Sequence, residues 1–389
     1  MTETTIAIEQ GGGPMLGVAP PEDVLLDVRD LKTYFHVMDG TVRAVDVVSF
    51  SLKRGSSIGV VGESGSGKSV TALTMMRLLD IPPAEIVDGE IWFDGRELVA
   101  MSDEDIRHIR GKDMAMIFQE PLTALNPLFT VGDQISEQIQ LHMKVKKREA
   151  WDRSIEMLKT VGIPNAETRV KQYPHEMSGG MRQRVMIAMA ISCEPKLIIA
   201  DEPTTALDVT IQAQIMELLK SIQQRTGASL MLITHDLGVI AEMVDDVIVM
   251  YAGQVVEQGH VDEVFLDPRA PYTEGLIRSI PSVVGRRRRL KAIRGTVPSP
   301  FNLPPACRFE PRCDYPWDLC RATEPELYQV GAPERGARCH LYGPAGRGHR
   351  SPVVGTASVE GETESTEAAR PDAAQVFLKS EQALEDRRQ

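Results

Sequence analysis

The residues of this 389-residue chain that are best suited to chemistry begin with a glycine-rich stretch at residues 62–69. Its sequence, Gly-Glu-Ser-Gly-Ser-Gly-Lys-Ser, fits the phosphate-loop spacing G-x-x-x-x-G-K followed by Ser or Thr. Glycines let backbone N–H groups turn toward phosphate oxygens, and a following helix presents the positive end of its dipole to them. We therefore expect Lys68 to reach the β and γ phosphates of a nucleotide and Ser69 to bind Mg²⁺. An ordinary glycine-rich turn is the alternative, but the apolar stretch at 57–61 and the helix-like stretch at 70–79 provide the flanking strand and helix that a phosphate loop needs.

A pair of acids follows the apolar stretch 197–200. Asp201 is expected at the carboxyl end of a buried parallel strand, beside the phosphate loop, where it can hold magnesium through water. Glu202 is then placed to accept a proton from an attacking water. Two acids alone could simply end a strand and cap the next element. Together with the phosphate loop they predict a site that hydrolyses a nucleotide.

These candidates require elements that bring several strand ends together. Short apolar stretches at 57–61, 196–200 and 229–233 alternate with helix-like stretches at 207–225 and 237–244. This alternation predicts an α/β fold with a parallel sheet covered on both faces.

Three flanking regions have a different pattern. Residues 25–52 alternate between apolar and polar side chains and predict an antiparallel β region, whereas residues 121–180 predict a helical subdomain inserted into the α/β core. Residues 247–259 predict a hairpin.

A third motif, Ser178-Gly179-Gly180, lies just before the strand that carries the acids and resembles the signature of ATP-binding cassette (ABC) proteins. Ser-Gly-Gly at the start of a helix is itself an anion site, built from backbone donors, a hydroxyl and the helix dipole. The family usually has Gln where this chain has Met181. The resemblance implies a P-loop NTPase cassette whose signature completes the ATP site of a second cassette, so that two cassettes act as a dimer.

Other positions match this family between about residues 24 and 260. Gln119 resembles the Q-loop glutamine, which senses the metal and the attacking water, and Asp208 resembles the D-loop aspartate. His235 resembles the switch histidine that contacts the γ phosphate. Phe35 lies where the family stacks an aromatic ring on adenine, and Tyr34 is the neighbouring alternative.

The resemblance therefore implies a complete ATP site. Its catalytic residues would be Glu202, His235 and Gln119, and its Mg²⁺ would be held through Ser69, Gln119 and Asp201. The full set of expected ATP-binding residues is Phe35, Gly62, Glu63, Ser64, Gly65, Ser66, Gly67, Lys68, Ser69, Val70, Gln119, Asp201, Glu202 and His235.

The subfamily is indicated by residues 118–127 and 178–185 and by an extension that includes residues 269–273 and 307–313. All four stretches resemble the ATPases of dipeptide and oligopeptide importers. The extension also holds four of the five cysteines, Cys307, Cys313, Cys320 and Cys339. Thiolates suit tetrahedral Zn²⁺ or an iron–sulfur cluster, and the spacing alone leaves zinc, a cluster and unligated cysteines open. The resemblance implies a 4Fe–4S cluster, while Cys193 is expected to be a small core residue.

These patterns divide the chain into four parts. We expect a flexible N-terminus at 1–23, the cassette at 24–265 with its helical subdomain at about 121–180, a small Cys-rich C-terminal domain at 266–342, and a largely disordered tail at 343–389 with a short helix near 374–387.

Composition excludes some functions. The 55 acidic and 43 basic residues give a net charge of −12, which argues against a protein that coats nucleic acid. The dense basic run Arg286–Arg289 is expected to be solvated surface, or else to contact anionic lipid or a partner subunit. The chain shows neither a signal peptide nor an apolar run long enough to span a bilayer, so we expect a peripheral protein at the cytoplasmic face of the cell membrane.

The resulting hypothesis is an ATPase subunit of a peptide importer. The resemblance implies two membrane permease subunits, a second homologous ATPase and an extracytoplasmic peptide-binding protein as partners. Nickel chelates and glutathione are alternative cargoes. Less favoured hypotheses are an ABC ATPase that acts in translation or DNA repair, and a regulatory subunit that binds ATP without turnover.

Overall fold

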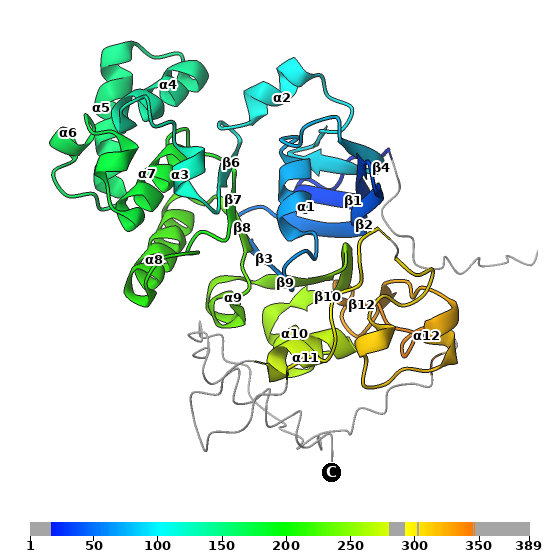
Figure 1. Cartoon of the computed structure of the whole chain (residues 1–389). Helices are drawn as coiled ribbons and strands as arrows, with labels where there is room; N and C mark the ends of the chain where they lie inside the picture. The colour runs from blue at the N-terminus through cyan, green and yellow to red at the C-terminus, as the bar shows by residue number, and fades with distance from the viewer. Residues whose placement is uncertain (1–16, 280–291, 302, 345, 347–389) are drawn as a thin grey trace, which may run out of the picture.

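The computed structural model describes residues 17–279, 292–301, 303–344 and 346 (Figure 1). The expectations for Arg286–Arg289, for most of the N-terminus and the tail, and for a helix near 374–387 therefore lie outside the described residues.

The central element is an eight-stranded sheet with the strand order β11-β12-β10-β9-β3-β8-β7-β6. Strands β3, β8 and β7 pair in parallel, as predicted, and β9 and β6 add to this parallel group on either side. Strands β9 and β10 form the predicted antiparallel hairpin. The strands are β3 (Ser57–Val61), β6 (Met114–Ile117), β7 (Leu197–Asp201), β8 (Ser229–Ile233), β9 (Asp246–Tyr251), β10 (Gln254–His260), β11 (Tyr328–Gln329) and β12 (Gly336–Ala337).

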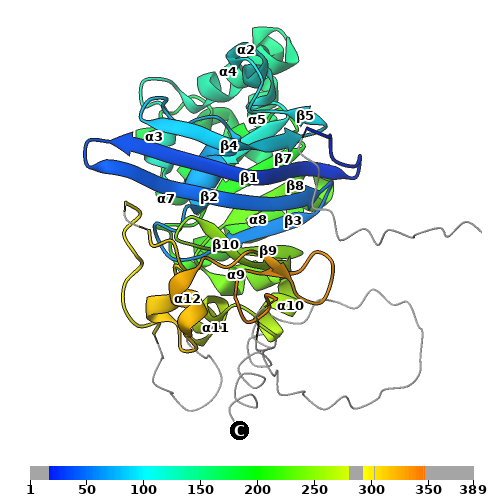
Figure 2. The same cartoon turned by 90° about the vertical axis from the view of Figure 1, so that its right-hand side faces the viewer.

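A second, antiparallel sheet has the order β2-β1-β4-β5 (Figure 2). The predicted antiparallel region corresponds to its two long strands, β1 (Val24–Val37) and β2 (Gly40–Lys53). Strands β4 (Ala84–Phe93) and β5 (Arg96–Glu97), which the sequence patterns did not predict, complete it.

Helices cover the sheets and form the subdomain at the upper left of Figure 1. The subdomain contains α3 (Pro121–Ala124), α4 (Val131–Met143), α5 (Lys147–Thr160), α6 (Ala166–Arg169), the 3₁₀ turn η1 (Pro174–Glu176) and α7 (Gly179–Ile191). The remaining helices are α1 (Lys68–Met75), α2 (Asp103–Ile109), α8 (Val209–Thr226), α9 (Leu237–Met243), α10 (Val261–Leu266), α11 (Pro271–Arg278), the 3₁₀ turn η2 (Glu310–Arg312) and α12 (Asp318–Ala322).

The two faces of the large sheet belong to two hydrophobic cores. Along β7, Ile198 and Ala200 join the core shared with α4, α5, α7 and α8, while Leu197 and Ile199 join the core shared with the antiparallel sheet. This alternation follows from the period of two of an extended strand. Burial on both faces explains why the strand is continuously apolar.

A separate Cys-rich domain at 266–342 is not confirmed. Its two short strands, β11 and β12, extend the large sheet by pairing with β10, and the region lies beneath β2 in Figure 2. The sequence boundaries at 24–265 and 266–342 stay predictions.

The helical subdomain should depend on its internal packing. Ile135 on α4 is fully buried in the core with α5 and α7, so Ile135→Ala should lower the free energy of unfolding by about 2–5 kcal/mol. Leu141 on the same helix is 69% exposed, and Leu141→Ala should change that free energy by less than about 0.5 kcal/mol. Urea unfolding followed by circular dichroism measures both; equal effects would contradict this packing.

Candidate nucleotide-binding and hydrolysis site

The phosphate loop turns sharply between β3 and α1, and two of its glycines are required by space. Gly62 has φ +152°, and a Cβ there would lie 2.2 Å from the carbonyl oxygen of Met250. Gly67 has φ +101°, and its Cβ would lie 2.4 Å from the carbonyl oxygen of Ala44. Any side chain at either position would displace a neighbouring backbone.

Lys68 and Ser69 begin α1 at the inner side of this loop. Lys68 Nζ donates to the carbonyl oxygens of Gly62 at 2.8 Å and Glu63 at 3.1 Å, while Ser69 Oγ donates to Asp201 Oδ1 at 2.9 Å. The structure thus brings together the predicted phosphate-binding lysine and two predicted Mg²⁺ ligands.

Burial disfavours the charged forms of both Asp201 and Lys68. It raises the pKa of Asp201, although the Ser69 hydroxyl opposes the shift, and it lowers the pKa of Lys68. Anionic phosphates near Lys68 and a divalent cation near Asp201 would oppose both shifts, so the site suits a magnesium–nucleotide complex.

Glu202 lies at the centre of a group of polar side chains. Gln119 Nε2 donates to Glu202 Oε2 at 3.1 Å, and Thr205 Oγ1 donates to the same oxygen at 2.8 Å. His235 Nδ1 lies 3.6 Å from Glu202 Oε1. The three predicted catalytic residues are therefore together, and Thr205 is an additional contact that the sequence patterns did not reveal, although it lies three residues after Glu202.

The backbone at Glu202 has a left-handed conformation, with φ +44°. Its N–H donates to the carbonyl oxygen of Ile233 at 2.8 Å, which ties the end of β7 to the end of β8. A non-glycine residue in this conformation is uncommon, and it persists where the surrounding structure holds it.

Phe35 and Tyr34, the two candidates for stacking on adenine, occupy adjacent positions of β1. Tyr34 donates from its hydroxyl to Asp46 Oδ1 at 2.7 Å, and the Arg43 guanidinium lies 5.7 Å from its ring centroid. Burial, together with this bond, raises the pKa of Tyr34 to about 12. Phe35 is half-buried, and its role as the adenine-stacking residue stays a prediction.

The signature residues lie apart from this group. Ser178 caps α7 by accepting from the Met181 N–H at 3.4 Å, and a Cβ on Gly180 would lie 3.0 Å from Ile211 on α8. Asp208, the D-loop aspartate, caps α8 by accepting from the Ile211 N–H at 3.0 Å. Figure 1 shows α7 to the left of β7 and α1 to its right, as expected if the signature acts on the nucleotide of another cassette.

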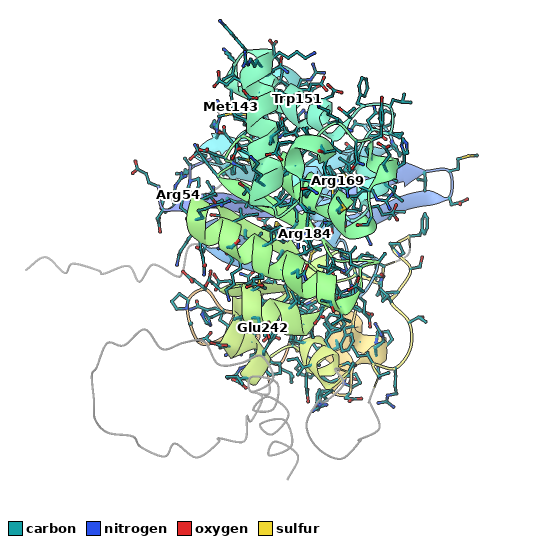
Figure 3. All side chains as sticks on the ribbon, turned by 90° about the vertical axis from the view of Figure 1, so that its left-hand side faces the viewer. Arg54, Met143, Trp151, Arg169, Arg184 and Glu242 are labelled. Atoms are coloured by element: carbon teal, nitrogen blue, oxygen red, sulfur yellow. The ribbon has the colours of Figure 1, made fainter. Side chains whose placement is uncertain are left out.

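Arg184 on α7 fixes the signature helix against its neighbours (Figure 3). Its Nη1 donates to the carbonyl oxygen of Val161 after α5 at 2.5 Å, and its Nη2 donates to Gln214 Oε1 on α8 at 3.0 Å. The signature is therefore connected both to the helical subdomain and to the helix that follows the D-loop.

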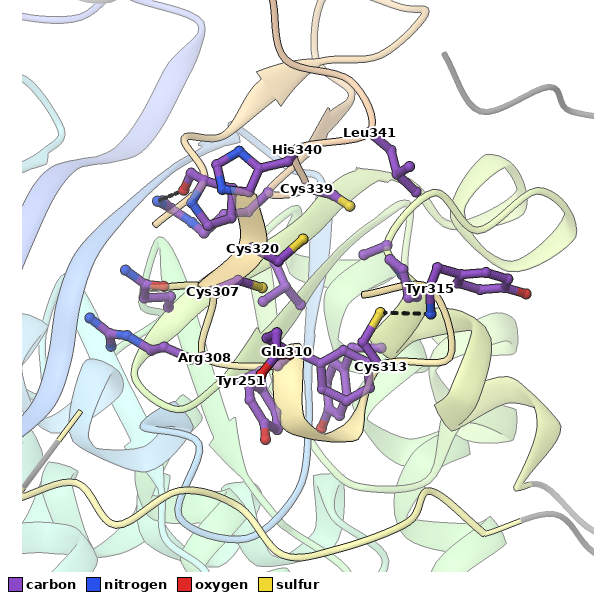
Figure 4. A pocket seen from close by; sticks show the side chains of 18 of the residues that line it. Tyr251, Cys307, Arg308, Glu310, Cys313, Tyr315, Cys320, Cys339, His340 and Leu341 are labelled. Atoms are coloured by element: carbon purple, nitrogen blue, oxygen red, sulfur yellow. Dashed lines mark hydrogen bonds between the residues drawn. The ribbon is translucent and has the colours of Figure 1, made fainter. Parts of the chain in front are cut away.

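The four C-terminal cysteines line one cavity of about 40 Å³ (Figure 4). Burial raises the pKa of Cys307 to about 11, and those of Cys313 and Cys339 to about 12. Within the ranges that the structure describes, however, no group of three or more His, Cys, Asp or Glu residues is arranged to hold a metal ion. The expected iron–sulfur site is thus not supported by the structure.

Two contacts to the phosphate loop come from residues that sequence reasoning missed. Arg312 forms an ion pair with Glu63, and the Tyr272 hydroxyl accepts from the Glu63 N–H at 2.9 Å. No sequence signal could have paired residues more than 200 positions apart.

Comparison with known proteins agrees with this geometry. Residues 45–205 match the model of the ABC transporter family, and residues 256–320 match the oligopeptide/dipeptide transporter C-terminal region. The chain is 52% identical to the oligopeptide transport ATP-binding protein AppD of Bacillus subtilis, over 82% of this chain and 97% of AppD. It is 48% identical to the dipeptide transport ATP-binding protein DppD of Haemophilus influenzae, over 81% of this chain and 95% of DppD.

Solved structures show the same cassette. A dimeric, post-hydrolysis structure of the ATP-binding cassette MJ0796 bound to ADP and Pi matches with a TM-score of 0.55 and 26% identity, over 61% of this chain and 99% of that chain. The structure of cbiO1 from Clostridium perfringens matches with a TM-score of 0.53 and 30% identity, over 63% of this chain and 92% of that one. With the phosphate loop, the acidic pair and the signature in place, this chain belongs to the family of ABC transporter ATP-binding subunits, ATPases coupled to transport, and to its oligopeptide and dipeptide transporter branch.

Proposed function

We propose that this chain hydrolyses ATP to power the import of dipeptides or oligopeptides through separate membrane permease subunits. The observation that carries the hydrolysis is the placement of Gln119, Thr205 and His235 around Glu202. The peptide cargo is supported by the similarity to AppD, an oligopeptide transport ATP-binding protein, and to DppD, a dipeptide transport ATP-binding protein.

The chemistry follows from the positions of these side chains. Ser69 and Asp201, together with Gln119, would hold Mg²⁺, which would supply charge neutralisation at the β and γ phosphates. Glu202 accepts the proton of the attacking water, and Gln119 and His235 orient the groups around it. Thr205 fixes one carboxylate oxygen by donating to it, which leaves the other oxygen directed toward His235.

ATP binding would close two cassettes around the nucleotide. The dimeric structure of MJ0796 supports the pairing of two cassettes. In such a pair, Ser178, Gly179 and Gly180 would act on the partner's ATP. The second cassette would be a homologous ATPase subunit, with a second copy of this chain as the alternative. The same complex would contain two permeases and, outside the membrane, a peptide-binding protein.

The permeases supply the membrane-spanning part of the complex. In the described part of this chain no helix has the length and apolar character needed to cross a bilayer. After Gln119, the side chains of Leu122, Leu128 and Phe129 are 62%, 78% and 53% exposed, which supports permease docking on the helical subdomain. We therefore place the subunit at the cytoplasmic face of the cell membrane, as a peripheral protein.

We also propose that Cys307, Cys313, Cys320 and Cys339 bind a 4Fe–4S cluster, with Zn²⁺ as the alternative. The support is the donor set itself, four thiols that line one cavity. A bound cation would favour the thiolates and so oppose the effect of burial on their pKa values.

The general-base assignment predicts a selective loss of turnover. Glu202→Gln keeps the side-chain shape but removes the base, so ATPase activity of the purified transporter complex should fall by about 10²–10⁴-fold while ATP binding is retained. Glu242→Gln on α9, an exposed carboxylate, is the matched control and should keep full activity. Wild-type ATPase activity in the Glu202→Gln complex would disprove the assignment.

The transport hypothesis predicts uptake that depends on hydrolysis. Proteoliposomes containing the complete complex and its binding protein should accumulate a labelled dipeptide or oligopeptide with ATP, and Glu202→Gln should abolish the accumulation. Labelled glutathione and a nickel chelate test the alternative cargoes in the same assay. Accumulation of either of these, without peptide uptake, would replace the peptide assignment.

The cluster hypothesis predicts iron and acid-labile sulfide in the full-length protein purified without oxygen, at about four of each per chain. Cys313→Ser should remove both, and Cys193→Ser, which changes a core cysteine outside the cavity, should not. Zinc in place of iron would support the alternative ligand, and absence of both metals would refute a metal site.

A further inference from the structure

The phosphate loop is held from outside the cassette core by side chains of the C-terminal region. The point of attachment is Glu63, the second residue of the loop. Its side chain, its N–H and its carbonyl oxygen each have a defined partner.

Arg312 holds the side chain. Its Nη1 donates to Glu63 Oε2 at 2.7 Å and its Nη2 donates to Glu63 Oε1 at 3.0 Å, which is the bidentate geometry of a strong arginine–carboxylate pair. The same guanidinium donates to the carbonyl oxygen of Arg294 at 2.9 Å and to the Tyr251 hydroxyl at 3.3 Å. Only 5% of the Arg312 side chain is exposed, so water cannot easily replace these partners.

Tyr272 on α11 holds the backbone. Its hydroxyl accepts from the Glu63 N–H at 2.9 Å, and its ring packs 4.6 Å from Tyr251 and 5.4 Å from Phe309, centroid to centroid. Phe309 and Arg312 come from the same C-terminal segment, and the Arg312 guanidinium lies 6.0 Å from the Phe309 ring centroid. The aromatic cluster therefore fixes both groups that hold Glu63.

The carbonyl of Glu63 faces the inside of the loop. It accepts from Lys68 Nζ at 3.1 Å and from the Ser66 N–H at 3.2 Å. A shift of Glu63 would consequently move two residues that are expected to bind phosphate. Only Glu63 therefore lies between the C-terminal side chains Arg312 and Tyr272 and the expected phosphate-binding residues.

The same segment reaches the adenine side of the site. Arg308 is paired with Asp46, the residue that accepts from the Tyr34 hydroxyl, and Arg308 Nη1 donates to the carbonyl oxygen of Ala252 at 2.6 Å. Arg308 and Arg312 are four residues apart on one short segment. That segment therefore contacts the phosphate loop directly through Glu63 and reaches Tyr34 through Asp46.

We infer that Arg312 and Tyr272 are positioning residues of the ATP site, which hold Glu63 and so keep the phosphate loop in its nucleotide-binding conformation. The inference rests on the ATP site proposed above. Because neither side chain reaches the reacting atoms, losing one weakens ground-state and transition-state binding together. Such a change raises KM and leaves kcat nearly unchanged.

The test compares Arg312→Gln with Arg321→Gln in the complete transporter complex. Arg321 donates to Glu310 in the same segment but is 63% exposed, which makes it the matched control. Arg312→Gln should raise KM for MgATP about tenfold, the order expected for loss of a charge-assisted hydrogen-bond pair, with little change in kcat. Arg321→Gln should behave like the wild type.

A double-mutant cycle identifies the partner. If Arg312 acts through Glu63, the KM of the double variant Arg312→Gln/Glu63→Gln should be close to that of Arg312→Gln alone, and not the product of the two single effects. Multiplicative effects would overturn the inference.

Hydrogen exchange of the full-length chain without nucleotide separates positioning from general destabilisation. Arg312→Gln should speed exchange at the amides of residues 62–69 and leave those of α4 and α5 unchanged. Tyr272→Phe, which removes the acceptor for the Glu63 N–H, should give the same local pattern. Faster exchange throughout the chain in both variants would show a structural role and overturn the inference.

The outcomes also distinguish this inference from the proposed function. A wild-type complex that fails to bind ATP would refute the ATP site itself. A wild-type complex that binds ATP, together with an Arg312→Gln complex whose KM matches that of Arg321→Gln, would refute only the positioning role.

Discussion

The hydrogen bond from the Glu202 N–H to the carbonyl oxygen of Ile233 joins the carboxyl ends of two neighbouring parallel strands, and the site is built at that junction. Parallel strands place all their carboxyl ends at one edge of the sheet, so the order β3-β8-β7 brings the phosphate loop, the acidic pair and His235 to the same edge. The topology of the sheet alone therefore brings these residues together, although they are far apart in sequence. The apolar strands provide the rigidity, and the loops that follow them provide the chemistry.

This junction also explains the unusual backbone at Glu202. A left-handed conformation costs free energy for a residue with a side chain, and it persists only where surrounding contacts outweigh the cost. Here the strand-to-strand hydrogen bond, the Thr205 hydroxyl and the Gln119 amide all hold the same residue. Glu202 is therefore oriented before substrate binds, as electrostatic preorganisation requires.

The sequence patterns predicted what depends on local spacing, namely the phosphate loop, the acidic pair, three of the parallel strands and the helical character of the subdomain. They did not predict β4, β5 or β6, nor the strands that join the C-terminal region to the large sheet. Strands β5, β11 and β12 have two residues each, which is too short for a period of two to appear. Arg312 could not be paired with Glu63 from the sequence, because 249 residues separate them and only folding brings them together.

The contact between Arg312 and Glu63 makes the C-terminal region part of the support of the phosphate loop. Its strands extend the cassette sheet, Arg312 pairs with Glu63 of the phosphate loop, and Arg308 pairs with Asp46, which accepts from Tyr34. The region is therefore not an appendage that could move without consequence. Arg308 directly follows Cys307, and Arg312 directly precedes Cys313. The segment 307–313 therefore carries two of the cavity's cysteines as well as the two arginines. The segment that helps to line the cysteine cavity is therefore the same segment whose Arg312 holds Glu63 of the phosphate loop. The two bonds from Arg312 to Glu63 are 2.7 and 3.0 Å long, so lengthening them by about 1 Å would take both beyond hydrogen-bonding distance and release the phosphate loop from this segment.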